Sequence, residues 1–328
     1  MVLKPDYLKV IDDIKYARIY SSTKTVLTGL QLLMRIVNDA KNFEELSTNL
    51  MVIVPLLFKA RPTSAMLLNS IKNFVAEVVK ASEEGDLDYV KQHVNKKMEE
   101  IEKKILRLAE LTAKIASHRI NDGDVILTSS YSTIVLKAFK FALQEGKEFK
   151  VYVTESRPGS EGLRLAIELT RIGLKTTLFV DSAVRYMIKD VDNVFLGSEA
   201  VAANGALINK VGSSLIALAA NEARVRVFAL APTLKFSPET LLGELVVLAE
   251  GEPSSLLPEG LRAEFEGKIN VKVPLFDVTP PEYIDAIITE KGLIAPQAVV
   301  MILKEIYGWP FHVATLDEIL EGLRSWQK

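Results

Sequence analysis

The fold is decided at residues 121–132, which read NDGDVILTSSYS. An Asn-Asp-Gly-Asp turn ends a long helical pattern, a short apolar and β-branched run follows, and hydroxyl residues come directly after it. From this point onward such runs alternate with helical stretches. The expected strands are residues 125–128, 149–154, 176–181, 193–197 and 225–231.

The gaps between these runs have helical periodicity. The expected helices are residues 132–144, 162–172, 183–189 and 212–223. Strands separated by roughly 20 to 30 residues, with a helix in each gap, favour right-handed βαβ crossovers. The sequence therefore predicts an α/β fold in which this region is a Rossmann-like, doubly wound and mainly parallel sheet.

The residues before the turn contain no strand signal. Apolar residues recur there at helical spacing, with breaks near Ser21, Asn42, Pro62 and Gly85. The expected helices are residues 6–20, 22–38, 42–59, 64–81 and about 86–118. We therefore predict an N-terminal helical domain over residues 1–120 and a Rossmann-like ligand-binding domain over residues 121–328.

The composition excludes several classes of protein. The formal net charge is −2, which gives no general attraction to nucleic acid or to an anionic membrane. Without cysteine there can be no disulfide, no thiolate catalysis and no cysteine-ligated metal. The most apolar early run, from Leu50 to Phe58, contains Pro55 and is far shorter than the roughly 20 residues of a membrane span. We expect a cytoplasmic protein that binds neither membranes nor, directly, nucleic acid.

The motifs of the common cofactor enzymes are absent. No Gly-x-Gly-x-x-Gly follows a strand, and there is no P-loop, nucleophile elbow or Asp-x-Asp calcium loop, so we predict no cofactor and no metal. Ligands of doubly wound sheets bind beyond the carboxyl ends of the strands. Most of the candidate ligand-binding residues follow the expected strands, and these are Ser130, Ser132, Glu155, Arg157, Glu199, Asn204, Asn209 and Lys210.

This set of side chains suits a phosphorylated sugar or a nucleotide. Hydroxyls, helix N-termini, Arg157 and Lys210 can hold phosphate, whereas carboxylates and amides suit sugar hydroxyls. Simpler interpretations stay open for several of them. Ser132 can cap the helix that it opens, and Asn204 before a glycine is a common turn residue. Arg157 can be a solvated loop residue and Glu199 an edge residue held by loop amides.

Five segments together resemble one protein family. They are residues 60–66 (ARPTSAM), 126–132 (ILTSSYS), 151–158 (VYVTESRP), 202–213 (AANGALINKVGS) and 276–284 (FDVTPPEYI). The family contains the alpha, beta and delta regulatory subunits of translation initiation factor 2B and their archaeal relatives. It also contains ribose-1,5-bisphosphate isomerase and methylthioribose-1-phosphate isomerase. The first segment adds Arg61 to the candidate ligand-binding residues, although Arg61-Pro62 can also be a simple helix stop.

The resemblance carries expectations about fold and partners. It implies a helical domain joined to a Rossmann-like domain through which family members dimerise, so we expect a homo-oligomer, a dimer or larger. Among the subtypes, the chain looks most like an alpha-type regulatory subunit. That likeness implies the alpha subunit of initiation factor 2 as a protein partner.

The resemblance also bears on catalysis. The isomerase branch uses a cysteine after the first strand and an aspartate after the fourth, and the matching residues here are Ser130 and Glu199. A hydroxyl is a poorer acid or base than a thiol, and glutamate moves the carboxylate by one methylene. We therefore expect a non-catalytic regulatory subunit that binds a sugar phosphate or nucleotide. The alternative is a ribose-1,5-bisphosphate isomerase of nucleoside salvage.

Overall fold

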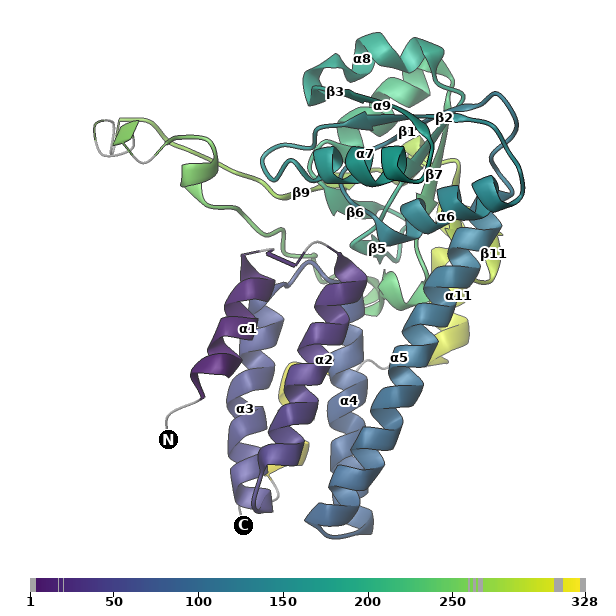
Figure 1. Cartoon of the computed structure of the whole chain (residues 1–328). Coiled ribbons are helices and arrows are strands. Elements are labelled where there is room, and N and C mark those ends of the chain that lie inside the picture. The colour runs from purple at the N-terminus through teal and green to yellow at the C-terminus, as the bar shows by residue number, and fades with distance from the viewer. Residues whose placement is uncertain are drawn as a thin grey trace. The chain divides into compact units, whose positions relative to one another are not determined.

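The computed structural model describes residues 4–16, 18–19, 21–258, 260–261, 264, 268–309 and 315–324 (Figure 1). The chain divides into two compact units, which we call the helical unit (residues 1–107 and 306–328) and the sheet unit (residues 108–305). This division differs from a boundary at residue 120. The last turns of the fifth helix pack into the core of the sheet unit, and the C-terminal helix packs in the helical unit.

The helical unit is built from amphipathic helices. They are α1 (Pro5–Lys15), α2 (Ser22–Asp39), α3 (Phe43–Ala60), α4 (Ala65–Glu84), most of α5 (Leu87–Ser117) and α12 (Leu316–Arg324). The side chains of Ser21 and Asn42 cap α2 and α3 by accepting hydrogen bonds from backbone N–H groups. The helix α12 packs against α3 and α4, where the buried Ser47 hydroxyl donates to the carbonyl of Leu323 at 2.8 Å.

The main sheet of the sheet unit has the order β3-β2-β1-β4-β7-β10-β11. Its strands are β1 (Val125–Thr128), β2 (Lys150–Thr154), β3 (Lys175–Phe179), β4 (Asn193–Leu196), β7 (Arg226–Leu230), β10 (Ala286–Thr289) and β11 (Gly292–Ile294). All neighbours pair in parallel except β11, which is antiparallel to β10. The strand order reverses between β1 and β4, so the predicted α/β class and doubly wound sheet are confirmed.

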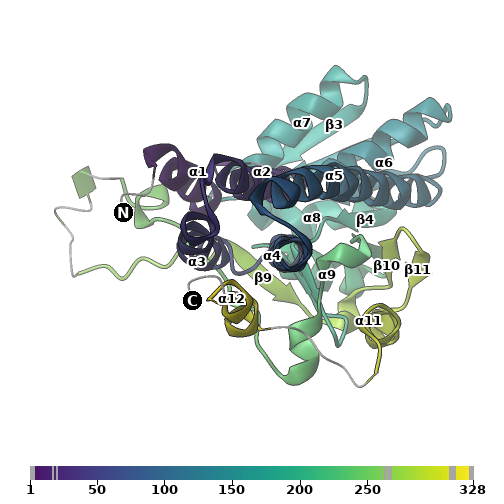
Figure 2. The same cartoon turned by 90° about the horizontal axis from the view of Figure 1, so that it is seen from below.

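Helices cover both faces of this sheet (Figure 2). They are α6 (Thr133–Gln144), α7 (Glu161–Arg171), α8 (Val184–Met187), α9 (Ser213–Ala223) and α11 (Val299–Tyr307). Alternate strand residues point to opposite faces. Ile126, Val151 and Phe195 therefore pack in the same cluster as α6 and α7, and Phe195 stacks on Phe139 of α6 with centroids 6.1 Å apart. Burial on both faces explains the apolar runs of the central strands β1, β4 and β7, whereas the edge strand β3 is largely exposed.

A second, smaller sheet was not predicted from the sequence. It has the order β8-β5-β6-β9 and consists of β5 (Ala200–Ala202), β6 (Leu207–Lys210), β8 (Phe236–Ser237) and β9 (Phe276–Thr279). Between β8 and β9 the chain makes a long excursion (Figure 1). In β6 and β9, Asn209 faces Asp277 and Lys210 faces Phe276 across an antiparallel pair. This pairing fixes where two of the predicted site residues point.

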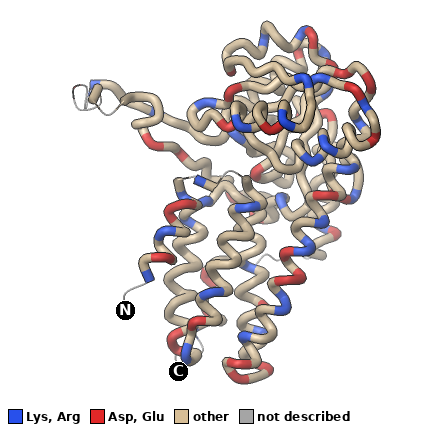
Figure 3. The backbone as a smooth tube through the Cα atoms, viewed as in Figure 1, with Lys and Arg blue, Asp and Glu red and all other residues tan. Residues whose placement is uncertain are grey.

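Charge is mixed along the chain. Figure 3 shows basic and acidic residues interspersed on the long helix α5, as expected for a solvated helix face. Among the described residues, no helix is both long enough and apolar enough to cross a bilayer.

Candidate functional site

The loops after β1 and β2 are joined by a buried hydrogen bond. The backbone N–H of Ser130 donates to the hydroxyl of Ser156 at 2.6 Å, and both residues are buried. Ser132 caps α6, since its hydroxyl accepts from the N–H of Val135 at 3.3 Å. The hydroxyl-rich loop predicted after the first strand therefore lies against the loop after the second, at the carboxyl edge of the sheet.

Three serines in these loops have left-handed backbone conformations. The φ angles are +58° at Ser130, +63° at Ser156 and +54° at Ser160. For a residue with a side chain, this region costs roughly 1 kcal/mol or more relative to the right-handed regions. Such conformations persist where the surroundings hold them, and they concentrate at functional sites.

The carboxylate of Asp181 holds the loop after β2 in place. Asp181 follows β3, and its two oxygens accept from the N–H groups of Ser156 at 2.8 Å and Arg157 at 2.7 Å. The Arg157 side chain is exposed, and its Nη2 donates to the carbonyl of Ser255 at 2.8 Å. Glu155 is partly exposed, and its N–H donates to the carbonyl of Phe179. Arg157 is thus placed on the rim of the loop, tied to the excursion between β8 and β9.

The residues directly after β4 are closely packed and buried. Gly197 is closely enclosed, because a Cβ there would lie 2.9 Å from Cβ of Ser132 and 3.9 Å from Oδ1 of Asn209. Glu199 follows and is only 5% exposed, with its N–H bonded to the carbonyl of Ile208. A buried carboxylate therefore stands at the carboxyl end of β4, next to the segment that brings Ser132 and Asn209 together.

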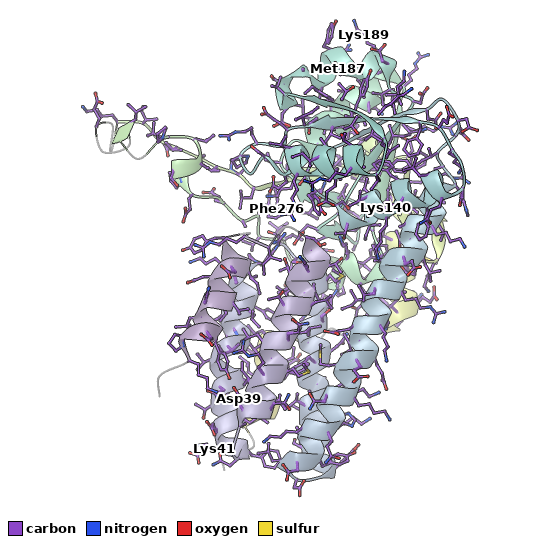
Figure 4. The ribbon with its side chains drawn as sticks, in the orientation of Figure 1. Asp39, Lys41, Lys140, Met187, Lys189 and Phe276 are labelled. Atoms are coloured by element: carbon purple, nitrogen blue, oxygen red, sulfur yellow. The ribbon has the colours of Figure 1, made fainter. Side chains whose placement is uncertain are left out.

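Lys210 forms a largely buried ion pair. Its Nζ lies 2.6 Å from Oε1 of Glu161, and the two side chains are 15% and 10% exposed. The same ammonium lies 5.5 Å from the ring centroid of Phe276. Figure 4 labels Phe276. Glu161 is the first residue of α7, so the pair connects the end of β6 to the start of that helix. We call Glu161 and Lys210 the 161–210 pair.

The neighbouring residue Asn209 points to the other face of the small sheet. Its Nδ2 donates to the Ser213 hydroxyl at 2.9 Å, and that hydroxyl donates to the carbonyl of Lys210. Opposite it, the carboxylate of Asp277 accepts from the N–H groups of Gly212 and Ser214 at the start of α9. Burial raises the pKa of Asp277 to about 6, although the two backbone hydrogen bonds act to lower it.

Two predicted residues take part in none of the contacts given so far. Asn204 is exposed at the tip of the β5–β6 hairpin, where its Oδ1 accepts from the N–H of Ala206 at 3.0 Å. This is the turn role that the sequence left open for it. Arg61 belongs to the helical unit, where it is 7% exposed and its Nη1 lies 3.4 Å from the Thr25 hydroxyl. Ligand contact by either residue remains a prediction.

Sequence reasoning missed several polar groups of the site. Glu161, Lys235 and Ser156 are buried, and Asp277 is partly buried. The Nζ of Lys235 donates to the carbonyl of Ser198, directly before Glu199. Lysine is rarely fully buried without a partner, but burial itself is invisible in the sequence. For two of these residues the sequence did contain a usable signal, because Ser156 and Lys235 both come shortly after buried strands.

The model of the Initiation factor 2 subunit family matches residues 18–296. The chain belongs to this family. Two relatives are ribose 1,5-bisphosphate isomerases. That of Pyrococcus furiosus is 40% identical over 279 residues, covering 84% of this chain and 85% of the relative. That of Methanocaldococcus jannaschii is 42% identical over 271 residues, covering 82% and 84%.

Other members of the Initiation factor 2 subunit family are related too. Translation initiation factor eIF2B subunit delta of Dictyostelium discoideum is 32% identical over 274 residues, covering 80% of this chain and 44% of the relative. The crystal structure of Pyrococcus horikoshii translation initiation factor eIF-2B superposes with a TM-score of 0.76 at 27% identity. It covers 91% of this chain and 100% of the other. The predicted family resemblance is confirmed.

Proposed function

We propose that this protein is a ribose 1,5-bisphosphate isomerase. The observation that carries the proposal is the similarity to the two isomerases above, which extends over more than four-fifths of both chains in each comparison. The delta subunit is less similar, and less than half of its length is matched. The relatives thus favour the alternative drawn from the sequence over the non-catalytic regulatory subunit, and they do not support the expectation of an inactive protein.

The reaction needs a proton carrier held close to two adjacent carbons. In ribose 1,5-bisphosphate the phosphate on C1 keeps the ring closed, so C1 is not a free carbonyl. Conversion to the ketose breaks the C2–H bond and the C1–O4 ring bond and forms a C–H bond at C1, while the C2 hydroxyl becomes the carbonyl and its proton is balanced by the proton that O4 takes up as a hydroxyl. A positioned carboxylate can carry this proton and typically contributes about 10²–10⁴-fold to the rate. Glu199 is buried at the carboxyl end of β4, where doubly wound sheets bind their ligands.

The surrounding groups suit a sugar bisphosphate. The exposed Arg157 guanidinium donates through Nη2 to the carbonyl of Ser255, and its other N–H groups can donate to a phosphate group. The hydroxyl of Ser130, at the position of the isomerases' cysteine, can donate a hydrogen bond to a sugar oxygen. Because its pKa lies far above that of a thiol, we assign the proton transfer to Glu199 and a positioning role to Ser130.

The test is an assay with ribose 1,5-bisphosphate that follows formation of ribulose 1,5-bisphosphate. We expect turnover by the wild type and a loss of at least about 100-fold in kcat for Glu199→Gln. The double variant Ser130→Cys/Glu199→Asp introduces the pair of the isomerase branch and should be at least as active as the wild type. If neither the wild type nor this double variant turns over, the proposal is wrong.

A second candidate is a regulatory subunit that senses the same ligand. Ser130 favours it, because a serine hydroxyl cannot replace a thiol as an acid or base at neutral pH. This candidate predicts that a sugar phosphate raises the melting temperature without turnover. It also predicts a complex with the alpha subunit of initiation factor 2 at micromolar concentrations. Turnover that depends on Glu199 would decide against it.

We also propose that the protein is a homo-oligomer. Leu245 and Leu256, in the excursion between β8 and β9, are 91% and 52% exposed in the single chain. Apolar side chains this exposed gain free energy when a second copy covers them. Sedimentation velocity should give the mass of a dimer or a larger assembly, and Leu245→Asp should lower it.

A further inference from the structure

Two loops at the carboxyl edge of the main sheet are each held by a carboxylate from the next strand outward. Asp181 comes shortly after β3, which lies outside β2, and Glu290 comes directly after β10, which lies outside β7. Both residues are partly buried. They stand on either side of the point between β1 and β4 where the strand order reverses, and doubly wound sheets bind their ligands at this point. We call Asp181 and Glu290 the outer-strand carboxylates.

Asp181 uses both of its oxygens on the loop after β2. Oδ1 accepts from the N–H of Ser156 at 2.8 Å, and Oδ2 accepts from the N–H of Arg157 at 2.7 Å. Ser156 has a φ angle of +63°, and its hydroxyl accepts from the N–H of Ser130 at 2.6 Å. The carboxylate therefore fixes a residue in a costly conformation, through which the loops after β1 and β2 are joined.

Glu290 also uses both of its oxygens. Oε2 accepts from the N–H of Thr233 at 3.0 Å, and Oε1 accepts from the hydroxyl of the same residue. Thr233 begins a 3₁₀ turn that ends at Lys235, and the Nζ of this buried lysine donates to the carbonyl of Ser198. Ser198 directly precedes Glu199 in the sequence. Glu290 therefore sets the turn that supports the segment of the proposed proton carrier.

Two aspartates at the amino edge of the same sheet make simpler contacts. Oδ2 of Asp192 accepts from the N–H of Val125 at 2.8 Å, and Oδ2 of Asp285 accepts from the N–H of Val227 at 2.7 Å. Each contact satisfies one backbone donor near the start of a strand. An amide oxygen can also accept one such hydrogen bond, but an amide cannot accept at both ends, because its NH2 group is a donor. The outer-strand carboxylates, in contrast, require two acceptor oxygens.

We propose, on the basis of the isomerase function proposed above, that Asp181 and Glu290 are positioning residues for that reaction. Each acts through a loop and not through contact with the reacting carbons. Asp181 keeps the loop of Arg157 in register with the backbone of Ser130, and Glu290 keeps the Glu199 carboxylate in its place at the end of β4. Such placement matters, because a displacement of about 1 Å at a catalytic group can cost about 100-fold in rate.

The first measurement compares kcat and KM for ribose 1,5-bisphosphate in the wild type, Asp181→Asn and Glu290→Gln. These near-isosteric changes remove one acceptor and set an NH2 group against the second donor. Asp181→Asn should raise KM at least about fivefold, because the loop of Arg157 holds phosphate in the proposed function. Glu290→Gln should lower kcat at least about fivefold with a smaller change in KM, because it loosens the support of Glu199.

Amide hydrogen exchange gives a second readout, which does not need turnover. In Asp181→Asn, the amides of Ser156 and Arg157 should exchange at least about tenfold faster than in the wild type. In Glu290→Gln, the amide of Thr233 should do the same. The amides of the central strands should keep their rates in both variants, since a general loss of stability would accelerate them as well.

Four further variants separate positioning from folding. Asp192→Asn and Asp285→Asn are matched controls at the amino edge, and should change kcat and KM by less than about twofold. Thr233→Val removes the hydroxyl donor to Glu290 and keeps the N–H, so its kcat should fall by about twofold to fivefold. Asp181→Glu retains both acceptor oxygens, so its KM should lie closer to that of the wild type than the KM of Asp181→Asn. These milder changes decide the question where an amide variant does not fold.

The outcomes separate the positioning roles from the isomerase itself. Faster exchange of the loop amides with kcat and KM unchanged would reduce the outer-strand carboxylates to a structural role and overturn the proposal. Equal kinetic losses in the amino-edge controls would overturn it too. If the wild type binds ribose 1,5-bisphosphate without turnover, the isomerase is wrong, and a dissociation constant at least about fivefold higher in Asp181→Asn would still support positioning. No binding by the wild type would overturn both.

Discussion

The two faces of the small sheet use a carboxylate in different ways. On one face, Glu161 meets the ammonium of Lys210. On the other face, Asp277 meets the backbone N–H groups of Gly212 and Ser214 at the start of α9. Asp277 completes the end of a helix, and its negative charge occupies the place where an anion would otherwise bind.

The difference shows why a helix N-terminus is not evidence for a phosphate site. Asp277 already neutralises the dipole of α9, so this helix offers little to an anionic ligand. The 161–210 pair opposes its carboxylate with an ammonium, which carries a full charge. Oδ1 of Asp277 and Oε2 of Glu161 are both buried without a hydrogen-bond partner among the described residues, so the two faces differ in the group that each carboxylate meets, and the following changes test this contrast.

Breaking the 161–210 pair should have the largest effect. Lys210→Met leaves the buried Glu161 carboxylate unpaired, so we expect a loss of about 3 kcal/mol in the free energy of unfolding. Denaturant unfolding measures this change. The double variant Lys210→Met/Glu161→Met should recover most of the loss, because no buried charge remains. A single variant as stable as the wild type would mean that the pair is effectively solvated.

Neutralising Asp277 should change how stability depends on pH. Its pKa in the folded protein is raised to about 6 from an ordinary 3.8, so the folded state binds the proton more tightly than the unfolded state. The contribution of this group to stability is therefore fully present below about pH 4 and is lost as the pH rises through about 6. As the pH rises from 4 to 7, the free energy of unfolding of Asp277→Asn should increase by roughly 1–2 kcal/mol relative to that of the wild type, after allowance for partial exposure of the carboxyl group.

The pH experiment compares unfolding midpoints of the two proteins at matched ionic strength. A difference between them that stays constant from pH 4 to 7 would contradict the raised pKa. A difference that grows toward low pH would show that the backbone hydrogen bonds outweigh burial and lower the pKa instead.

Removing the hydroxyl of Ser213 should have a smaller effect. This buried hydroxyl accepts from Nδ2 of Asn209 and donates to the carbonyl of Lys210, so Ser213→Ala leaves both groups with one partner fewer. We expect a loss of about 1 kcal/mol in the free energy of unfolding. Ser214→Ala is the matched control, since only the backbone N–H of Ser214 takes part in the contact with Asp277.

An exposed ion pair should matter least. Lys4 Nζ lies 2.6 Å from Oδ2 of Asp39, but the two side chains are 59% and 44% exposed. Water and salt screen such pairs, so Lys4→Met should leave the unfolding midpoint within experimental error in 1 M salt. If Lys4→Met lowered the unfolding midpoint as much as Lys210→Met does, burial could not explain why the 161–210 pair is expected to matter more than the pair of Lys4 and Asp39.

Long periodic segments were predictable, whereas short ones were not. The third helix was expected at residues 42–59 and forms Phe43–Ala60, and the first strand was expected and found at Val125–Thr128. A helix of several turns repeats its pattern often enough to be recognised. The strands β5 and β8 have three and two residues, too few for an alternation to appear, so the second sheet was missed.

The candidate site was predictable in position but not in its pairings. Ser130, Ser132 and Glu199 were found by their place after strands, which the topology of the sheet dictates. Glu161 was not, because it stands where the sequence reads as the end of a turn, and its partner Lys210 is 49 residues away. Such a contact depends on how a helix and a separate small sheet pack, and no local pattern encodes it.

The left-handed serines have a consequence for engineering. Glycine adopts such φ angles without the steric penalty of a Cβ, so Ser130→Gly and Ser156→Gly relieve backbone strain at the edge of the site. At Ser156 the gain is offset by the loss of the hydroxyl that accepts from Ser130. Selection for thermostability alone would therefore favour glycine first at Ser130, where the backbone N–H and not the hydroxyl makes the contact with Ser156.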